Sequence, residues 1–347
     1  MGGAAFRRVL ITGGAGFIGS NFARFLLERG SAEVVVLDKL TYAGNLANLQ
    51  DLTESSEFRL IVGDICDAPA VQVAVEGCDA IVNFAAETHV DRSLLDAAAF
   101  IQTNVYGTWV LLEAARREGV RRYVQVSTDE VYGEVPEAFS IETDPLCPRS
   151  PYSASKAGAD MMVQAYVATH GLDASITRGS NTYGPYQFPE KVIPLMITNA
   201  MEERPLPVYG DGRQVRDWIH VWDHCAGIDA VLRRGEPGEA YNVGGGNPRE
   251  NLDVIRAILR LLERPESLVH HVTDRPGHDR RYALATDKLR SLGWEPTIQF
   301  EDGLRQTVAW YRDQRSWWEP LRDTGFEQYY ARNYATRAVV DIDPIGA

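Results

Sequence analysis

The first half of the chain alternates short apolar runs with longer stretches of mixed polarity. The runs are rich in β-branched residues and are apolar almost without interruption. This pattern is typical of parallel strands joined by helical crossovers, in a sheet whose two faces are both covered by helices. The predicted strands lie at residues 8–12, 34–37, 60–63, 80–84, 123–126 and 174–177.

The composition changes beyond Asn181, where Gly and Pro become frequent and the predicted elements become shorter. A long helix is predicted just before this point, at residues 153–170. Apolar residues then recur at helical spacing in a series of shorter segments. These segments are residues 221–232, 252–262, 286–292 and 301–312.

Composition narrows the class of protein. The 347 residues are enough for a large core, and the length favours two domains. A net charge of −13, from 48 acidic and 35 basic residues, disfavours a general nucleic-acid or anionic-membrane surface. The 4 cysteines are far apart and lack a Cys-x-x-Cys spacing, so we expect buried thiols in a reducing compartment rather than disulfides or metal ligands. We see no membrane span and no signal segment, and we expect a cytoplasmic protein.

A glycine-rich loop joins the first strand to the first helix. Gly14, Gly16 and Gly19 match Gly-x-Gly-x-x-Gly, and Gly13 adds a further permissive position. Such a loop lets the backbone approach a pyrophosphate at a helix amino terminus. Asp38 ends the second strand, where its carboxylate can accept hydrogen bonds from both ribose hydroxyls and would repel a 2′-phosphate. The sequence therefore predicts a site for NAD rather than NADP.

Other candidate cofactor residues follow the third and fourth strands, at the edge where open sheets bind ligands. Asp64 can bind the adenine amine, although it can equally cap the following helix. Ala85 and Ala86 are small enough to leave room for a cofactor.

Tyr152 and Lys156 lie four residues apart on one face of a predicted helix. A phenol is a poor base because its ordinary pKa is about 10. A nearby ammonium and a positively charged nicotinamide would both favour the phenolate, so Tyr152 could take an alcohol proton as hydride leaves. An isolated Tyr-x-x-x-Lys pair is more often a surface feature. Its position after the fifth strand, with Thr128 at that strand's tip, favours catalysis.

Two adjacent carboxylates, Asp129 and Glu130, directly follow Thr128. Close carboxylates in a dry site rarely both ionise, so one can act as an acid while the other acts as a base. An arbitrary Asp-Glu pair at a strand end is more often a turn residue and a solvated side chain. Beside the glycine loop and Tyr152, the pair indicates redox chemistry coupled to loss of water.

These motifs resemble those of the extended short-chain dehydrogenase/reductases, and within them those of the dTDP-glucose 4,6-dehydratases. The resemblance covers about residues 8–322. It rests on residues 12–20, 38–45, 85–93, 128–133, 152–156, 188–191, 216–218 and 274–279.

The resemblance implies a doubly wound parallel Rossmann sheet with a smaller mixed α/β C-terminal substrate domain. We expect residues 1–185 to bind NAD and carry the catalytic residues. Residues 186–322 should bind mainly the nucleotide sugar, and we leave open whether they cross back to the sheet. Residues 323–347 show no clear period, and we expect a loosely attached tail. The helices near residues 97–117 and 153–170 resemble the pair that forms the dimer interface of the family, so we expect a homodimer, although a helix that is apolar on more than one face can also be deeply buried.

The implied reaction is a lyase reaction in three steps: oxidation at C4 by NAD, elimination of water across C5 and C6, and return of the hydride to C6 with reprotonation of C5. Tyr152 takes the proton of the sugar 4-hydroxyl while Thr128 hydrogen-bonds that oxygen, and Lys156 holds the cofactor ribose. Glu130 then acts as base at C5 and Asp129 as acid at the 6-hydroxyl. The implied cofactor contacts are Gly13, Gly16, Phe17, Ile18, Gly19, Asp38, Lys39, Leu40, Thr41, Asp64, Ile65, Phe84, Ala85, Ala86, Thr103, Tyr152, Lys156 and Thr182.

The substrate diphosphate needs cations, and the carboxyl half supplies arginines and a lysine in matching motifs. The implied substrate contacts are Thr88, Thr128, Asn181, Lys191, Val192, Pro207, Val208, Tyr209, Arg216, Asn251, Asp274, Arg275, Pro276, Gly277 and His278. Among them, Pro207, Val208 and Tyr209 are expected to flank the nucleotide base. His89 has no second ligand at a suitable spacing, and we expect no metal.

Two other functions compete with dehydration. An epimerase or decarboxylase of the same superfamily would use the redox step without needing Asp129 and Glu130. A regulatory protein that senses NAD would tolerate loss of Tyr152 or Lys156, yet both are present. The residues leave open the choice between thymidine and uridine and the pathway that uses the product.

Overall fold

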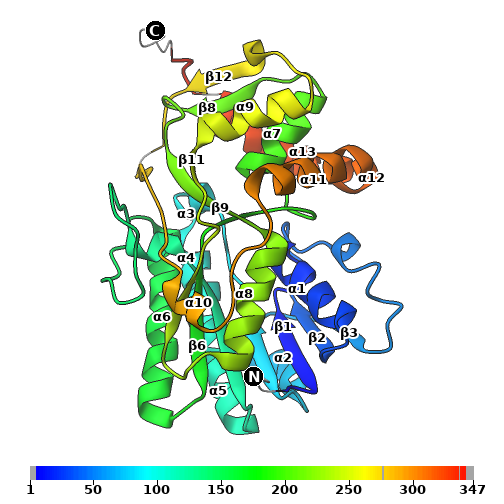
Figure 1. Ribbon diagram of the computed structural model, residues 1–347. Helices are drawn as coiled ribbons and strands as arrows, with labels where there is room; N and C mark the ends of the chain where they lie inside the picture. The colour runs from blue at the N-terminus through cyan, green and yellow to red at the C-terminus, as the bar shows by residue number, and fades with distance from the viewer. Residues whose placement is uncertain (1–4, 276, 336, 341–347) are drawn as a thin grey trace.

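A seven-stranded parallel sheet forms the lower half of the molecule (Figure 1). The computed structural model describes residues 5–275, 277–335 and 337–340. The strand order is β10-β6-β5-β4-β1-β2-β3, and every neighbouring pair is parallel. The strands are β1 (Arg8–Thr12), β2 (Glu33–Asp38), β3 (Phe58–Val62), β4 (Ala80–Asn83), β5 (Arg122–Thr128), β6 (Ala174–Gly179) and β10 (Ala240–Val243).

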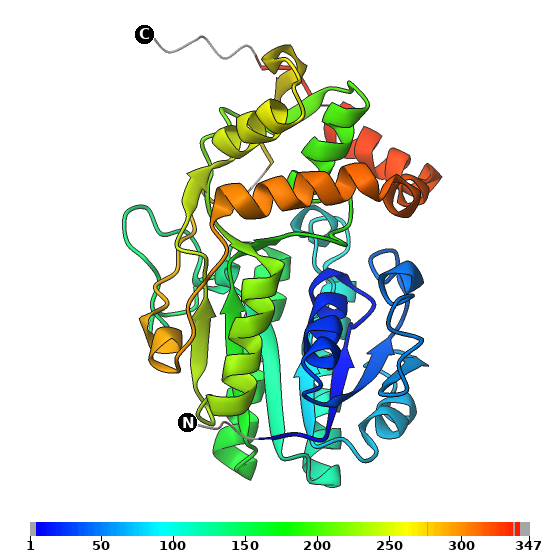
Figure 2. The ribbon, with the colours of Figure 1, turned by 45° about the vertical axis from the view of Figure 1, so that its right-hand side comes forward.

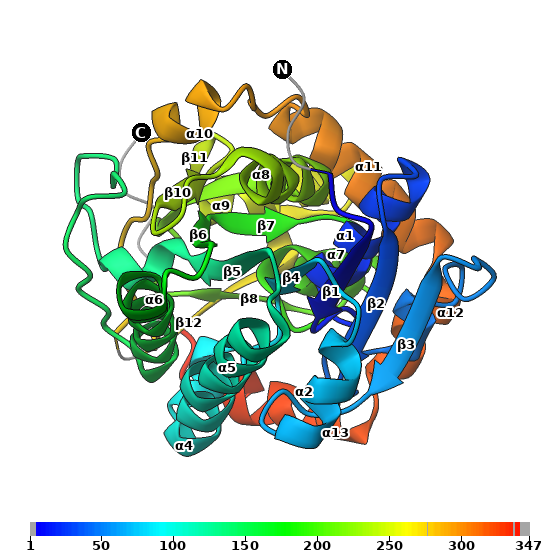
Figure 3. The ribbon, with the colours of Figure 1, turned by 90° about the horizontal axis from the view of Figure 1, so that it is seen from below.

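Helices cover both faces of this sheet, as the uninterrupted apolar strands require. Figure 3 shows α1 (Phe17–Glu28) and α8 (Val221–Arg234) on one face. The opposite face carries α2 (Ala68–Val75), α5 (Thr108–Glu118) and α6 (Pro151–His170). Each face buries its own hydrophobic core. The predicted doubly wound fold is confirmed.

The seventh strand, β10, is missing from our prediction. It follows α8 and pairs with β6, so the chain returns to the large sheet after residue 186. β10 has only 4 residues, and one of them is the buried polar Asn242. The Asn242 amide donates to the carbonyl oxygen of Ser140 and accepts from the Tyr132 hydroxyl. A run this short and interrupted by a polar residue gives little strand signal.

Smaller sheets and helices form the upper region, which lies beyond the carboxyl ends of the large sheet's strands (Figure 2). This region has its own hydrophobic core, and α11 runs across its lower side. Its strands are β7 (Asn181–Tyr183), β9 (Val215–His220) and β11 (Pro248–Glu250) in one sheet, with β8 (Leu206–Tyr209) and β12 (Val269–Val272) in another. Its longer helices are α7 (Val192–Met201), α9 (Asn251–Leu261) and α11 (Phe300–Asp313).

Short helices complete the fold, and one predicted helix differs from expectation. The helix expected at residues 97–117 is α-helical in α4 (Ala97–Phe100), π-helical in η2 (Ile101–Gly107) and α-helical again in α5. The other short helices are η1 (Leu46–Asn48), α3 (Val90–Ser93), η3 (Asp129–Tyr132), η4 (Glu266–Leu268), α10 (Asp287–Ser291), α12 (Arg315–Trp318), η5 (Glu319–Leu321), α13 (Thr324–Tyr330) and η6 (Ala331–Ala335).

The expectation of a loosely attached tail is wrong for α13 and η6. Asp323 caps α13 by accepting the N–H of Phe326, and the Phe326 ring is buried in the upper core. Phe326 and Tyr330 therefore anchor this segment to the upper core. The segment is too short for its apolar residues to show a clear helical period. No helix among the described residues has the length and apolar character needed to cross a bilayer.

Candidate active site

A cavity of about 310 Å³ lies between the carboxyl edge of the large sheet and the upper region. The glycine loop, the ends of β2, β4 and β5, and the first turns of α6 all contribute to its walls. Residues predicted from the sequence to bind cofactor and to catalyse therefore share one space. This is where open α/β sheets bind their ligands.

The glycine loop has no room for side chains. Gly13 has φ +67°, and a Cβ there would lie 2.6 Å from the backbone nitrogen of Ala85. A Cβ on Gly19 would lie 2.4 Å from the carbonyl oxygen of Gly13. Gly14 is instead needed for packing between the loop and β2, because a Cβ at this position would lie 2.7 Å from the Val36 side chain. Gly16 precedes the first turn of α1 and offers no capping side chain, which leaves N–H groups free for an anion.

Asp38 is buried at the end of β2. Burial raises the pKa of its carboxyl, while hydrogen bonds from the N–H groups of Leu40 and Ala15, at 2.8 and 2.9 Å, act in the opposite direction. Leu40 is absent from the described cavity lining, and its backbone N–H instead orients Asp38.

Asp64 lines the cavity beside Lys39, with 2.7 Å between carboxylate and ammonium. Partial burial would raise the pKa of Asp64, but the Lys39 hydrogen bond and the N–H of Cys66 bring it below its usual value. The residue that precedes α2 is Asp67. The alternative in which Asp64 caps that helix is therefore wrong.

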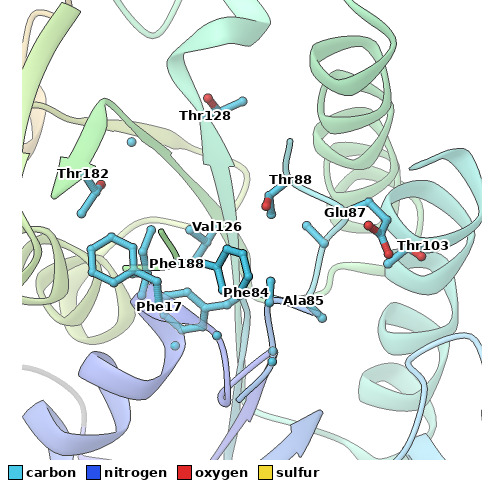
Figure 4. A pocket seen from close by; sticks show the side chains of 18 of the residues that line it. Phe17, Phe84, Ala85, Glu87, Thr88, Thr103, Val126, Thr128, Thr182 and Phe188 are labelled. Atoms are coloured by element: carbon cyan, nitrogen blue, oxygen red, sulfur yellow. The ribbon is translucent and has the colours of Figure 1, made fainter. Parts of the chain in front are cut away.

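The shape and donors of this half of the cavity fit NAD. A loop without side chains, a free helix amino terminus and a buried carboxylate are what a dinucleotide needs. In Figure 4, Thr103 from η2 and Glu87 lie at one side of the cavity, and the rings of Phe17 and Phe84 lie at another. The predicted cofactor residues that line it are Gly13, Gly16, Phe17, Ile18, Gly19, Asp38, Lys39, Thr41, Asp64, Ile65, Phe84, Ala85, Ala86, Thr103, Tyr152, Lys156 and Thr182.

Thr128, Asp129 and Glu130 are presented by the turn from β5 into η3. The Thr128 hydroxyl accepts the N–H of Glu130 at 3.3 Å and donates to Oδ1 of Asp129 at 3.1 Å. Oδ2 of Asp129 is buried and has no hydrogen-bond partner within the described residues. The turn brings both carboxyl groups to the wall of the cavity.

The two carboxyl groups differ in their electrostatic surroundings. Burial, and then the negative charge of Glu130, raise the pKa of Asp129 to about 8. Burial also raises the pKa of Glu130, but Arg275, Arg216 and Lys191 oppose that effect. Asp129 thus holds its proton at neutral pH. The pKa of Glu130 is also raised above its ordinary value, and the three cations around it moderate that rise.

Tyr152 and Lys156 lie at the start of α6. Ser150 and Ser153 form a capping box at the first turn of this helix, and the side chains of Tyr152 and Lys156 are buried. The Lys156 ammonium donates to the carbonyl oxygen of Val126 at 2.7 Å, and burial lowers its pKa to about 8. The pair therefore faces the strand end that carries Thr128.

The pKa of Tyr152 differs from our expectation. Burial and the charge of Glu130 raise it, and a hydrogen bond with Thr128 only partly offsets them. We expected the ammonium of Lys156 to favour the phenolate of Tyr152. In the folded protein the phenol is instead favoured. The desolvation of a phenol with little exposed surface outweighs that attraction.

The predicted substrate residues fall into three places. Thr88, Asn181 and Lys191 line the main cavity, and the Lys191 ammonium donates to the carbonyl oxygen of Thr88 at 3.2 Å. A second cavity, of about 40 Å³, lies between α7, β8 and α9. The predicted residues that line it are Val192, Pro207, Val208, Tyr209 and Asn251.

The third group lines neither described cavity: Arg216, Asp274, Arg275, Gly277 and His278. Nδ1 of His278 lies 2.6 Å from Oδ1 of Asp274. Nε of Arg275 lies 3.6 Å from Oδ1 of Asp91, and its Nη1 is buried without a hydrogen bond to any described residue. This unsatisfied donor fits a role in holding phosphate. Pro276 lies outside the described residues.

Three further residues of chemical interest line the main cavity, namely Glu87, Glu190 and His224. Glu190 belongs to one of the motifs noted above and could have been found from it. His224 comes from α8, far along the chain, and its Nδ1 lies 2.7 Å from the Thr182 hydroxyl. Burial lowers the pKa of His224 to about 4, so the ring is neutral. No local sequence signal could have placed it here.

Comparisons with known proteins agree with this geometry. Residues 10–307 match the family model described as GDP-mannose 4,6 dehydratase. The chain is 52% identical over 321 residues to the dTDP-glucose 4,6-dehydratase of Streptomyces niveus, covering 91% of this chain and 96% of that protein.

Solved structures are similar as well. DesIV, a dTDP-glucose 4,6-dehydratase from Streptomyces venezuelae with NAD and TYD bound, has a TM-score of 0.89 and 52% identity, and the match covers 90% of this chain and 99% of that chain. The Thermus thermophilus UDP-glucose 4-epimerase in complex with NAD has a TM-score of 0.83 and 34% identity, with 88% of this chain and 99% of that chain covered.

Proposed function

The chain belongs to the NAD-dependent nucleotide-sugar epimerase/dehydratase family, and from that premise we propose that it is a dTDP-glucose 4,6-dehydratase. This lyase converts dTDP-glucose to dTDP-4-keto-6-deoxyglucose, a step toward deoxysugars. NAD is its cofactor, and the dTDP-sugar is its substrate.

The first step is deprotonation of the sugar 4-hydroxyl. We assign the base to Tyr152, whose neighbour Thr128 can hydrogen-bond both the phenol and the sugar oxygen. Bound NAD supplies the redox chemistry by accepting hydride from C4 and returning it to C6. Lys156 orients the phenol and the ribose from α6, where its ammonium is held by the carbonyl oxygen of Val126 in β5.

The second step is elimination of water across C5 and C6. Glu130 takes the C5 proton, and the C–H electron pair forms the new double bond. The C6–O bond breaks as Asp129 gives its proton to the departing 6-hydroxyl. Glu130 later returns a proton to C5. Asp129 is suited to donate because its pKa of about 8 keeps it protonated at neutral pH.

One observation carries this proposal. Asp129 and Glu130 both line the cavity that holds Tyr152 and Lys156, and the pKa of about 8 keeps Asp129 protonated as an acid requires. An epimerase or decarboxylase of the same fold would need the Tyr152 chemistry without two acidic neighbours. The alternative in which they are a turn residue and a solvated side chain is disfavoured because Asp129 is buried.

The test is incubation with dTDP-glucose and, separately, with UDP-glucose, followed by mass analysis of the products. We expect dTDP-glucose to lose the mass of one water molecule and to yield a ketone that absorbs in alkali. A product of unchanged mass would indicate an epimerase instead, and preferential turnover of UDP-glucose would refute the dTDP-sugar assignment.

We propose that the three parts of the chain have the functions that the sequence suggested. Residues 1–185 supply the cofactor site and catalytic groups, residues 186–322 mainly hold the nucleotide sugar, and residues 323–347 form a C-terminal extension. The return of β10 to the large sheet ties the second part to the first.

A homodimer is the expected assembly. Apolar side chains remain exposed on the helical segments that the sequence analysis assigned to the interface, at Ile101, Tyr106, Trp109 and Met161. Tyr106 and Trp109 pack together, with 5.3 Å between ring centroids. An exposed aromatic and apolar face of this kind is typical of an interaction surface. The expectation of buried cysteines is wrong for Cys147, which is exposed because it lies in a loop, but all four are free thiols, which supports a cytoplasmic location.

A further inference from the structure

The C-terminal segment, residues 323–335 and 337–340, crosses the upper region beside the second cavity. We call it the C-terminal strap. It comprises α13, η6 and an extended stretch ending at Val340, and it lies beyond residue 307, where the match to the family model stops.

Backbone hydrogen bonds fasten the strap to β12. Val339 forms an antiparallel bridge with Val272. The N–H of Thr273 donates to the carbonyl oxygen of Ala338 at 3.0 Å, and the N–H of Val340 donates to that of His271 at 3.0 Å. β12 in turn pairs with β8, which carries Pro207, Val208 and Tyr209. The strap is therefore attached to the strand pair that we assign to the nucleotide base.

Tyr334 projects from the strap to the wall of the second cavity. Its ring packs against that of Tyr209, with 5.5 Å between centroids and 32° between planes. Arg337 places its guanidinium carbon 4.8 Å from the centroid of the Tyr209 ring. Arg337 also donates to the carbonyl oxygens of Thr273 and Asp274, at 3.1 and 3.0 Å. Two strap side chains thus contact the ring expected to flank the base.

The cavity as it stands is too small for a pyrimidine. Its volume of about 40 Å³ is well below the roughly 150 Å³ of a cavity that binds benzene, so a base that fills this site has to displace part of the lining. The walls from α7, β8 and α9 belong to the buried upper core, including Leu195, Val208 and Ile255. Tyr334, like Tyr209 and Asn251, is only partly buried, and unlike them it lies on the C-terminal strap, so we expect it to be the lining residue that shifts.

We propose that Tyr334 is a nucleobase-binding residue and that the strap is a lid over the base. As the pyrimidine enters, the strap shifts, and the Tyr334 ring stays against it as an aromatic wall that completes the site begun by Tyr209. Base–aromatic stacking of this kind is sequence-tolerant and contributes substantially to binding. This inference rests on the proposed function, because it takes the substrate to be a nucleoside diphosphate sugar.

The test compares Tyr334→Ala, Tyr334→Leu and Tyr334→Phe with the wild-type enzyme. Removing the aromatic face should raise the Kd for dTDP and the KM for dTDP-glucose roughly tenfold, with kcat changed by less than about twofold. Tyr334→Leu keeps apolar bulk but has no aromatic face, so it should resemble Tyr334→Ala. Tyr334→Phe keeps the ring and should bind as the wild type does.

A matched control is Tyr330→Phe, which keeps a strap ring and loses a hydroxyl bonded to Asn199, away from the cavity. Its Kd and KM should not change. Unchanged dTDP binding in Tyr334→Ala and Tyr334→Leu would overturn the inference. Tighter binding would also overturn it, since Tyr334 would then block the base site rather than contribute to binding.

The dTDP-binding readout separates this inference from the proposed function. If the wild-type enzyme fails to dehydrate dTDP-glucose, the proposed function fails, whatever the variants do. If the wild type is active while the Tyr334 variants bind dTDP normally, only the role of the strap is wrong.

Discussion

Asp129 shows how a single position acquires its chemistry from its surroundings. An ordinary aspartate is ionised at neutral pH, but burial beside Glu130 raises the pKa of Asp129 to about 8. The same burial acts on Glu130, where nearby cations oppose it. Of the two similar side chains, Asp129 is therefore the one suited to act as the acid.

This difference predicts a titration visible in the infrared. The unliganded enzyme should show the C=O stretch of a protonated carboxylic acid at pH 6, and this band should disappear as the pH rises through about 8. The sign follows from a raised pKa, since the folded protein keeps the proton over the range in which a solvated aspartate has lost it. Asp129→Asn should lack that band. Its persistence in this variant would mean that another carboxyl group holds the proton.

Sequence reasoning reached most of the residues that line the main cavity, because their motifs follow strand ends directly. Thr128, at the end of β5, is an example, while Tyr152 and Lys156 were found from their spacing of four residues at the start of α6. It could not reach His224, which arrives from α8 through tertiary packing. It also missed the effect of burial on Tyr152, because desolvation depends on neighbours that are distant in sequence.

At the scale of elements, the glycine loop has the tightest steric constraint. Gly19→Ala should reduce the NAD that co-purifies with the enzyme by roughly tenfold or more, because the new Cβ would lie 2.4 Å from the carbonyl oxygen of Gly13. The measurement is cofactor released from denatured protein per chain.

Gly30→Ala is the control for this prediction. Gly30 has φ +55°, but a Cβ at this position would meet nothing within 4 Å, and Gly30 is not part of the described cavity lining. The substitution should cost stability through backbone strain yet leave NAD content unchanged. Equal NAD content in Gly19→Ala and Gly30→Ala would contradict the role of the loop.

The elements themselves were largely predictable. The apolar runs located six strands of the large sheet because buried parallel strands have few polar residues. β10 escaped because it is short and carries Asn242, whose hydrogen bonds become visible only in the folded chain. The attachment of the C-terminal strap was not predicted for a related reason, since it depends on isolated aromatic residues and on backbone hydrogen bonds to β12.

At the scale of the whole molecule, the exposed apolar face of η2, α5 and α6 predicts association of two chains. A Trp109→Glu and Met161→Lys double variant should elute as a monomer, because it places charges at two partly exposed positions of that face. Light scattering coupled to gel filtration measures the mass. Glu118→Lys and His170→Lys, at the far ends of α5 and α6, provide a control for altered charge. A dimer that survives the double variant would place the interface elsewhere.

The central claim is that Asp129 and Glu130 divide the elimination between them, and exchange at C5 in deuterated water tests it most directly. Glu130→Gln and Asp129→Asn are each incubated with dTDP-glucose, and the sugars are analysed by mass and by NMR. We expect Glu130→Gln to give neither deuterium at C5 nor loss of water, and Asp129→Asn to incorporate deuterium at C5 while losing water far more slowly than the wild type. Deuterium at C5 with normal loss of water in Glu130→Gln would contradict the account.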